Sequence, residues 1–316
     1  MNKLLRYIFI LSLALLAVLF SAAMLGAESV NILSLDEQTR SILFDIRLPR
    51  IFLAACVGAS LAVAGAGLQA LLRNPLAEPY LLGVSNGAAL GTMVAFVFFG
   101  AFEWSRPVLA FAGAGLASVA VYQMARSRAG MSVERLVLSG VIVTTFLSSI
   151  IVMLTTVLDA ARLRSFTFWL LGDLSQASTM GIYVSFAAAI IGTLIIASQA
   201  RGLNLMMVGE RDARDFGVEV GRVRLLVFGA ASLVVGAAVA ASGSVGYVGL
   251  IVPHIVRLTI GSDNRLVVPL SAIVGAMFVV LADTVARTAI APRELPVGAI
   301  TALIGAPLFI YLLRRN

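Results

Sequence analysis

Long apolar runs separated by short polar segments follow one another along the whole chain. A helix needs roughly 20 apolar residues to cross the hydrocarbon core of a bilayer, and the pattern contains about ten runs of that kind. We expect membrane-spanning helices near residues 5–26, 50–72, 83–102, 107–126, 136–158, 178–200, 223–242, 247–260, 266–288 and 296–313. The eighth run is short. The pattern therefore predicts an all-α integral membrane fold in one domain, residues 1–316.

Positive charges are distributed unevenly between the segments that join these runs. If the N-terminus lies in the cytoplasm, most of the Lys and Arg residues fall in cytoplasmic loops and tails, as the positive-inside rule requires. Lys3 and Arg6 precede the first apolar run, which is longer than the roughly 7 to 15 apolar residues of a cleaved signal peptide. We therefore expect a retained first span, with both termini in the cytoplasm.

Composition agrees with a membrane protein and excludes other classes. Hydrophobic residues make up 60% of the chain and charged residues 12%, which is more apolar surface than a soluble core of this size can bury. The formal charge of +7 does not indicate nucleic-acid binding, because the arginines lie between apolar runs and form no aromatic-interleaved patch. The one cysteine, Cys56, lies inside an apolar run, so the sequence holds no disulfide framework.

An internal repeat relates the two halves of the chain. The pattern Val-Gly-Ala-x-x-Ala-x-x-Gly occurs at residues 57–65 and again at 235–243. The same offset also pairs Leu72 with Leu250, Pro75 with Pro253, Gly83 with Gly261 and Asn86 with Asn264. The first copy begins a span that runs inward and the second begins in one that runs outward, so we expect the halves to be inverted relative to each other, as in many transporters.

Small residues also follow one face of the second span. Gly58, Ala62 and Ala66 lie on one stripe of the expected helix. Such a stripe permits close contact between helices. We therefore expect this helix to pack against protein.

Neither of two common energy sources for transport is visible in the sequence. A phosphate-binding P-loop needs a lysine, and the only lysine is Lys3 in the N-terminal tail. A gradient-driven carrier usually has ionisable side chains near mid-membrane, yet the main charges within the spans are Asp283 and Arg287, near the outer end of the ninth. Energy should therefore come from a partner. A gradient-driven secondary transporter stays an alternative, because the inverted repeat suits it equally well. An integral-membrane enzyme would need a catalytic cluster, which we do not find.

Five short motifs within or beside the apolar runs carry a specific resemblance. They are RLPR at 47–50, Q-x-x-x-x-NPLAEP at 69–79, LGVSNGA at 82–88, GLIVPH at 249–254 and ELPVG at 294–298. With these motifs, nearly the full chain resembles the FecCD or BtuC-like family. The members of this family are permease subunits of binding-protein-dependent ABC importers for iron chelates, haem and vitamin B12.

The resemblance implies a multi-pass permease of the bacterial inner membrane, surrounded by lipid, that is not itself an enzyme. Two copies would form a homodimer, pair with two ATP-binding cassette subunits and receive their cargo from a periplasmic substrate-binding protein. The chain would need no cofactor of its own, because ATP and Mg would be bound by the partner ATPase. An iron chelate such as a siderophore complex is the favoured cargo, ahead of haem and cobalamin.

The most charged interval of the chain is expected to dock the ATPase. It lies in a cytoplasmic segment at about 203–224, where Gly217 can end a short helix at low cost and a second short turn can begin near Val220. In ABC importers this loop carries an EAA-x-x-x-G motif, and Ala213 and Gly217 match its third and seventh positions. The alternative is a solvated, salt-bridged loop. The candidate coupling residues are Glu210, Arg211, Asp212, Ala213, Arg214, Asp215, Phe216 and Gly217.

Three arginines near the predicted outer face are candidates for docking the binding protein. Arg47 and Arg50 flank Pro49 just before the second span, and Arg287 follows Asp283 by one helical turn. In the family, arginines at these positions meet glutamates of the binding protein, and a guanidinium can bind a carboxylate through two hydrogen bonds. The alternative for Arg47 and Arg50 is anchoring in the lipid headgroups. For Arg287 the alternative is a pair with Asp283.

Two groups of residues mark a candidate translocation path and gate. In the fifth span, Gly140, Thr144 and Ser148 recur every four residues, which suits either tight helix packing or the lining of a passage. The resemblance assigns this helix to the central channel. It also implies a cytoplasmic gate at Asn74, Leu76 and Ser139, for which the alternatives are turn chemistry and helix capping.

Overall fold

The structure is a computed structural model that describes residues 3–26, 36–99, 104–127, 130–175 and 177–315. Within these ranges, the one sheet is a two-stranded antiparallel ribbon of β1 (Arg126–Ser127) and β2 (Gly130–Met131). The fold is otherwise helical. The longer helices are α1 (Lys3–Met24), α3 (Leu48–Leu72), α4 (Val84–Phe98), α5 (Ser105–Ala125), α6 (Val133–Thr155), α8 (Thr179–Ser198), α11 (Val220–Ser242), α12 (Val248–Ile260), α13 (Asn264–Thr288) and α14 (Val297–Arg315).

Short elements join these helices. They are α2 (Glu37–Ser41), the π-helix η1 (Ile42–Arg47), the 3-10 turn η2 (Pro79–Leu82), α7 (Ala160–Leu170), α9 (Ala200–Val208) and α10 (Glu210–Asp215). Each of the predicted spans coincides with one of the longer helices. In the described part of the chain, 7 helices are long and apolar enough to cross a membrane, while α4, α12 and the apolar part of α14 are shorter. The all-α fold is thus confirmed, and a count of ten membrane crossings stays a prediction.

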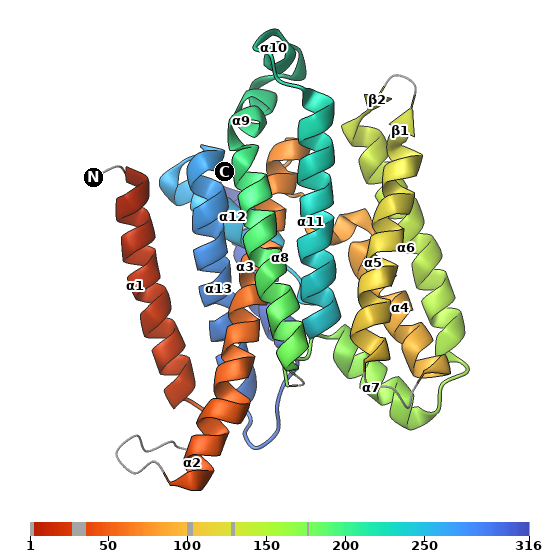
Figure 1. Cartoon of the computed structure of the whole chain (residues 1–316), viewed down its shortest axis with the longest axis vertical. Helices are drawn as coiled ribbons and strands as arrows, with labels where there is room; N and C mark the ends of the chain where they lie inside the picture. Colours follow the sequence, from red (N-terminus) through yellow and green to blue (C-terminus); the bar gives the residue numbers. More distant parts are fainter. Residues whose placement is uncertain (1–2, 27–35, 100–103, 128–129, 176, 316) are drawn as a thin grey trace.

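The connections between the helices gather at two ends of the molecule (Figure 1). One end, which we call the α10 end, carries α10 and the β1–β2 ribbon, and both chain termini lie toward it. The other, which we call the α7 end, carries α7 and α2. The termini therefore share one side of the helical body, as the charge distribution requires of two cytoplasmic termini. Which end faces the cytoplasm stays a prediction.

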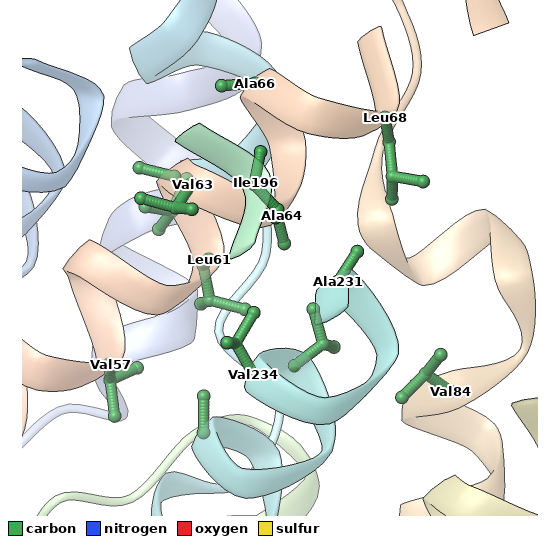
Figure 2. Packing of buried hydrophobic residues seen from close by; sticks show 14 of the residues in the cluster. Val57, Leu61, Val63, Ala64, Ala66, Leu68, Val84, Ile196, Ala231 and Val234 are labelled. Atoms are coloured by element: carbon green, nitrogen blue, oxygen red, sulfur yellow. The ribbon is translucent and has the colours of Figure 1, made fainter. Parts of the chain in front are cut away.

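α3 is the centre of the core. It is buried on nearly all sides because α8, α11, α12 and α13 surround it. Figure 2 shows Val57, Leu61 and Leu68 of α3 in one apolar cluster with Ile196 of α8 and Val234 of α11. A helix that is apolar all round can lie in a protein core or in lipid, and the contacts of α3 place it in the core.

Small residues let α3 approach its neighbours closely. A Cβ on Gly58 would overlap the carbonyl oxygen of Gly275 in α13, and a Cβ on Gly65 would overlap that of Gly249 in α12. Ala62, on the same stripe as Gly58, is fully buried. The predicted packing of this stripe against protein is confirmed, and it permits backbone contact that larger side chains would prevent.

Two irregular segments enter the interior from opposite ends and cross there. Residues 73–83 lead from the end of α3 to the start of α4, and residues 243–247 lead from the end of α11 to the start of α12. At the crossing, the Tyr80 hydroxyl donates to the carbonyl oxygen of Val245 (2.9 Å) and accepts from the Val245 N–H (2.9 Å). From this point α4 runs toward α7, whereas α12 runs toward the α10 end.

The inverted relation between the halves is visible in these elements, but the predicted offset does not pair equivalent positions, since it already places Leu72, the last residue of α3, against Leu250 inside α12. α3 ends and α11 begins at the same end of the molecule, so the two are antiparallel. The offset that pairs Pro75 with Pro253, however, places one proline in the turn after α3 and the other inside α12. The physical reason is that segment 73–83 is longer than segment 243–247, so no constant offset can relate both halves.

Candidate functional site

The candidate coupling loop lies at the α10 end as two short helices, α9 and α10. Leu203 and Met206 bury one face of α9, and Ala213 buries α10 against the body of the protein. The other side chains of α10 and the turn after it are exposed, apart from a partly buried Glu210. Phe216 and Val208 are 75% and 79% exposed, which leaves two large apolar side chains beside the charged ones. Exposed aromatic side chains and arginines, which this loop presents, are enriched at protein–protein interfaces.

Gly217 ends α10 as the sequence predicts. Its φ is +79°, its N–H donates to the carbonyl oxygen of Arg214 (2.9 Å), and the Val218 N–H donates to that of Ala213 (2.9 Å). The left-handed conformation that closes this turn costs little for glycine. The predicted second short turn near Val220 is wrong, because the buried Val220 and its neighbours already belong to α11. The second short helix is α9, before α10.

Glu210 connects the loop to the rest of the protein. Its carboxylate pairs with the guanidinium of Arg224 at the start of α11, with that of Arg214 (3.7 Å) and with that of Arg73 (3.8 Å). Arg73 is the residue that ends α3, in a left-handed conformation with φ of 50°, immediately before Asn74. One carboxylate therefore ties the coupling loop to α11 and to the first residue of segment 73–83.

α9 is held to the turn before α13. The Asn204 side chain donates to the Asp263 carboxylate (2.6 Å) and accepts from the Asn264 N–H (2.9 Å). The pKa of Asp263 lies below its ordinary value. Burial alone would raise this pKa, but hydrogen bonds from the Arg265 N–H and from Asn204 to the charged carboxylate outweigh that effect. The carboxylate is thus charged at neutral pH and fixes α9 relative to α13.

The predicted gate residues Asn74 and Leu76 form a tight turn. The Asn74 side chain accepts from the Leu76 N–H (2.9 Å), and its carbonyl oxygen accepts from the Ala77 N–H (3.1 Å). The alternative role of Asn74 in turn chemistry is therefore confirmed, and it does not conflict with a gate. Leu76 is 42% exposed and projects from the turn, whereas Ser139 is buried in α6. The structure does not bring Ser139 to the surface that Leu76 presents.

The small face of α6 packs against α4 and η2. Asn86 of α4 donates to the carbonyl oxygen of Thr144 (3.1 Å) and to the hydroxyl of Ser148 (2.6 Å). Gly140 is buried on the same face. These contacts favour the packing alternative for this stripe in the present conformation. A role in lining a passage stays a prediction.

Arg50 and Arg287 form a buried cluster with two acids at the α7 end. The Asp283 carboxylate accepts from Arg50 (2.9 Å) on one oxygen and from Arg287 (3.1 Å) on the other. Arg50 also pairs with the half-exposed Glu294 (2.7 Å). Asp283 is fully buried, and the two arginines are 6% and 5% exposed. The predicted alternative for Arg287, a pair with Asp283, is confirmed.

Arg47 and Arg287 also hold the end of α1. Arg47 donates to the carbonyl oxygen of Ala23 (3.1 Å), and Arg287 donates to that of Ala22 (3.3 Å). The last carbonyl groups of a helix have no partner within the helix, so cations are favourable there. Arg47 is 5% exposed. The headgroup-anchor alternative therefore does not describe Arg47 or Arg50, and docking of a binding protein stays a prediction.

Sequence reasoning missed the residues that join the two crossing segments. Glu78 accepts from the Tyr247 N–H (2.9 Å), and Tyr80 bonds Val245 in both directions. Glu78 lies inside the NPLAEP motif, so its position next to the gate residues could have drawn attention to it. Nothing in the sequence indicates its partner, which lies 169 residues away.

Comparison with known proteins identifies one family of membrane transport proteins. The model of the FecCD transport family matches residues 4–315. The chain is 44% identical over 278 residues to the cobalamin import system permease protein BtuC of Halobacterium salinarum, covering 88% of this chain and 74% of that protein. It is 37% identical over 323 residues to the hemin transport system permease protein HmuU of Yersinia pestis, covering 97% and 96%.

The fold has a close counterpart among solved structures. A metal-chelate type ABC transporter in an inward-facing conformation superposes with a TM-score of 0.90 at 32% sequence identity. The match covers 98% of this chain and 99% of that one.

Proposed function

Because this chain belongs to the FecCD transport family, we propose that two copies of it form the pore of an inner-membrane importer. The chain is a permease subunit of an ABC importer, as are its relatives. In the proposed assembly, two ATP-binding cassette subunits dock at the α10 ends and a substrate-binding protein docks at the α7 ends. ATP and Mg are bound by the partner ATPase, and this chain changes no bond in the cargo.

The proposed cargo is a metal chelate. Relatives carry names that refer to cobalamin, hemin and iron(3+)-hydroxamate, and the matching solved structure is of the metal-chelate type. These ligands share a bulky organic framework around a bound metal. We propose an iron chelate of the siderophore class first, with haem and cobalamin as the competing cargoes. Direct binding of each to the purified substrate-binding protein would decide among them.

The connection through Glu210 is the observation that carries the proposal. Movement of a docked ATPase would first displace the exposed side chains of α10. Since Glu210 pairs with both Arg224 and Arg73, that displacement reaches the start of α11 and the residue before Asn74. The coupling loop and the candidate gate thus act on the same short stretch of backbone. The pair with Arg224 is sheltered, because Arg224 is buried, whereas the pair with Arg73 is longer and more exposed and contributes less.

Uptake should depend on ATP hydrolysed by the partner. In proteoliposomes that contain this chain, its ATPase and its binding protein, an iron chelate should accumulate only when ATP is present on the side of the ATPase. The matched control is the chain reconstituted alone under a proton or sodium gradient. Accumulation in that control would identify a gradient-driven secondary transporter and overturn the proposal.

Replacing Gly217 with Val should uncouple the ATPase. A β-branched residue at φ of +79° is strained by roughly 1 to 3 kcal/mol, and the turn that follows α10 would open. Gly217→Asn is the matched control, because asparagine tolerates this conformation better. We expect the valine variant to fold, since a Cβ at this position meets no other atom. Its ATPase should co-purify less or lose substrate stimulation, and equal behaviour of both variants would remove the coupling role of the turn.

A further inference from the structure

A chain of contacts begins where segment 243–247 leaves the α7 end. The Asp173 N–H donates to the carbonyl oxygen of Ser242 (2.8 Å). Gly243, with φ of +67°, lies so close to Trp169 that a Cβ would overlap the Trp169 carbonyl oxygen. The start of the segment is thus fixed to the last turn of α7 and to the residues after it.

This series of contacts continues at the crossing of the two segments in the interior. The Tyr80 hydroxyl satisfies both the N–H and the carbonyl oxygen of Val245, and the Ser85 and Ser244 hydroxyls are 3.3 Å apart. Two residues after Val245, Tyr247 has φ of +67°, an uncommon conformation for a residue other than glycine, and its N–H donates to Glu78. Three residues of the segment therefore have partners in or next to residues 78–85.

The same contacts reach the candidate gate. Glu78 and Tyr80 stand two and four residues after Leu76, and between them Pro79 packs against Gly249, where a Cβ would lie 2.6 Å from the Pro79 Cδ. Ala77 is buried at 1% exposed. Little freedom is left between the exposed Leu76 and the start of α12. A shift of segment 243–247 must therefore move the gate turn or break these bonds.

We propose that Glu78 and Tyr80 are positioning residues that transmit the state of the α7 end to the gate turn at the α10 end. Tyr80 holds the backbone of Val245, and Glu78 holds that of Tyr247, so the crossing segments move as one body. The inference rests on the proposed function. The inference adds a route between the two ends of the molecule. Docking of a binding protein at the α7 end alters the gate turn at the α10 end. Through Arg73 and Glu210, it also alters the ATPase contact there.

A purely structural role for these bonds makes a different prediction. If they only stabilised the fold, their loss would lower the amount of assembled transporter without changing how the assembled fraction responds to binding protein. Coupling between two sites is the change that a ligand at one site makes at the other. The decisive readout is therefore the ratio of ATP hydrolysis with cargo-loaded binding protein to hydrolysis without it.

The test uses Tyr80→Phe in the reconstituted complex with its ATPase and binding protein. The ring stays and only the hydroxyl is lost, which leaves two polar groups of Val245 without their partner. We expect the stimulation ratio to fall about tenfold, the factor for leaving a buried polar group unpaired. Tyr122→Phe is the matched control, because no hydrogen bond of the Tyr122 hydroxyl is found among the described residues and its ring packs near Phe228.

Glu78 provides a second, conservative pair of variants. Glu78→Gln keeps an oxygen that can accept from the Tyr247 N–H and should retain most of the stimulation, whereas Glu78→Leu should lose it. An unchanged ratio in Tyr80→Phe and Glu78→Leu, at whatever yield, would overturn the proposal. Failure of the unaltered chain to assemble with any ATPase would instead refute the proposed function, so the two failures are distinguishable.

Thiol labelling of the gate turn gives an independent readout. Cys56 is the only cysteine of the chain and is buried, so Leu76→Cys on a Cys56→Ala background places one accessible thiol at the turn. Adding binding protein at the α7 end should change the labelling rate of this thiol. The change should persist with Tyr122→Phe and disappear with Tyr80→Phe. A response that survives Tyr80→Phe would contradict the proposed route.

Discussion

Replacing Asp283 with Asn should lower the stability of the folded chain by about 3 to 5 kcal/mol, because it removes one partner from a buried ion cluster. The fully buried Asp283 faces Arg50 and Arg287, and among the residues that the structure describes, its loss leaves Arg287 without an ion pair and Arg50 with the half-exposed Glu294 alone. The end of α1 should loosen as well, since Arg287 also holds its last carbonyl groups. Thermal unfolding of the purified chain in detergent is the measurement.

Glu219→Gln is the matched control for this prediction. Glu219 pairs with Arg222 at 4.0 Å, and both side chains are about three-quarters exposed, so its loss should be small. A shift of the unfolding midpoint as small for Asp283→Asn as for Glu219→Gln would show that the cluster does not stabilise the fold.

The buried cluster also affects how a docking experiment on Arg50 is interpreted. Arg50→Glu would place a third carboxylate beside Asp283 and Glu294, so a loss of binding-protein affinity in that variant would report misfolding as readily as docking.

Replacing Gly58 with Ala should separate α3 from α13. The added Cβ would overlap the carbonyl oxygen of Gly275, which is backbone and can yield only if a helix moves. Overpacking of this kind costs about 1 to 3 kcal/mol or more. Gly229→Ala is the matched control, because Gly229 is also inside a long apolar helix but a Cβ there meets no atom within 4 Å.

The two variants should therefore differ in stability. Alanine is a better helix former than glycine by about 1 kcal/mol, so Gly229→Ala should be neutral or slightly stabilising. Gly58→Ala should lower both the unfolding midpoint and the yield of folded protein. Equal midpoints for the two would mean that the α3–α13 contact tolerates a methyl group, and the close approach of these helices would then not be required.

The membrane helices were accessible to sequence reasoning for a simple reason. A bilayer demands long apolar helices whose backbone groups are all paired internally, so hydropathy alone located each of them. Gly217 was also predicted from the local sequence, because the turn that ends a short charged helix needs a residue that adopts a positive φ at little cost. The short helices α7 and α9 were missed, because neither is long or apolar enough to leave such a pattern.

The candidate site was predictable only as a set of residues. The motifs pointed to Arg50, Asn74 and Gly217, but local spacing says nothing about partners that lie far along the chain. Arg50 meets Asp283 across 233 residues, and Tyr80 meets Val245 across 165. Glu210 was placed correctly in the coupling loop without any indication that it reaches Arg73.

By itself the sequence determined the membrane class, the positions of the apolar helices and the family, because these depend on composition, local periodicity and short motifs. The tertiary structure alone decided that Arg50 and Arg287 are buried in ion pairs, that the small face of α6 packs against α4, and that two segments from opposite ends cross at Tyr80. Each of these depends on which surfaces of distant helices meet. That choice is made by side-chain packing and by the pairing of buried polar groups, and neither leaves a local signature in the chain.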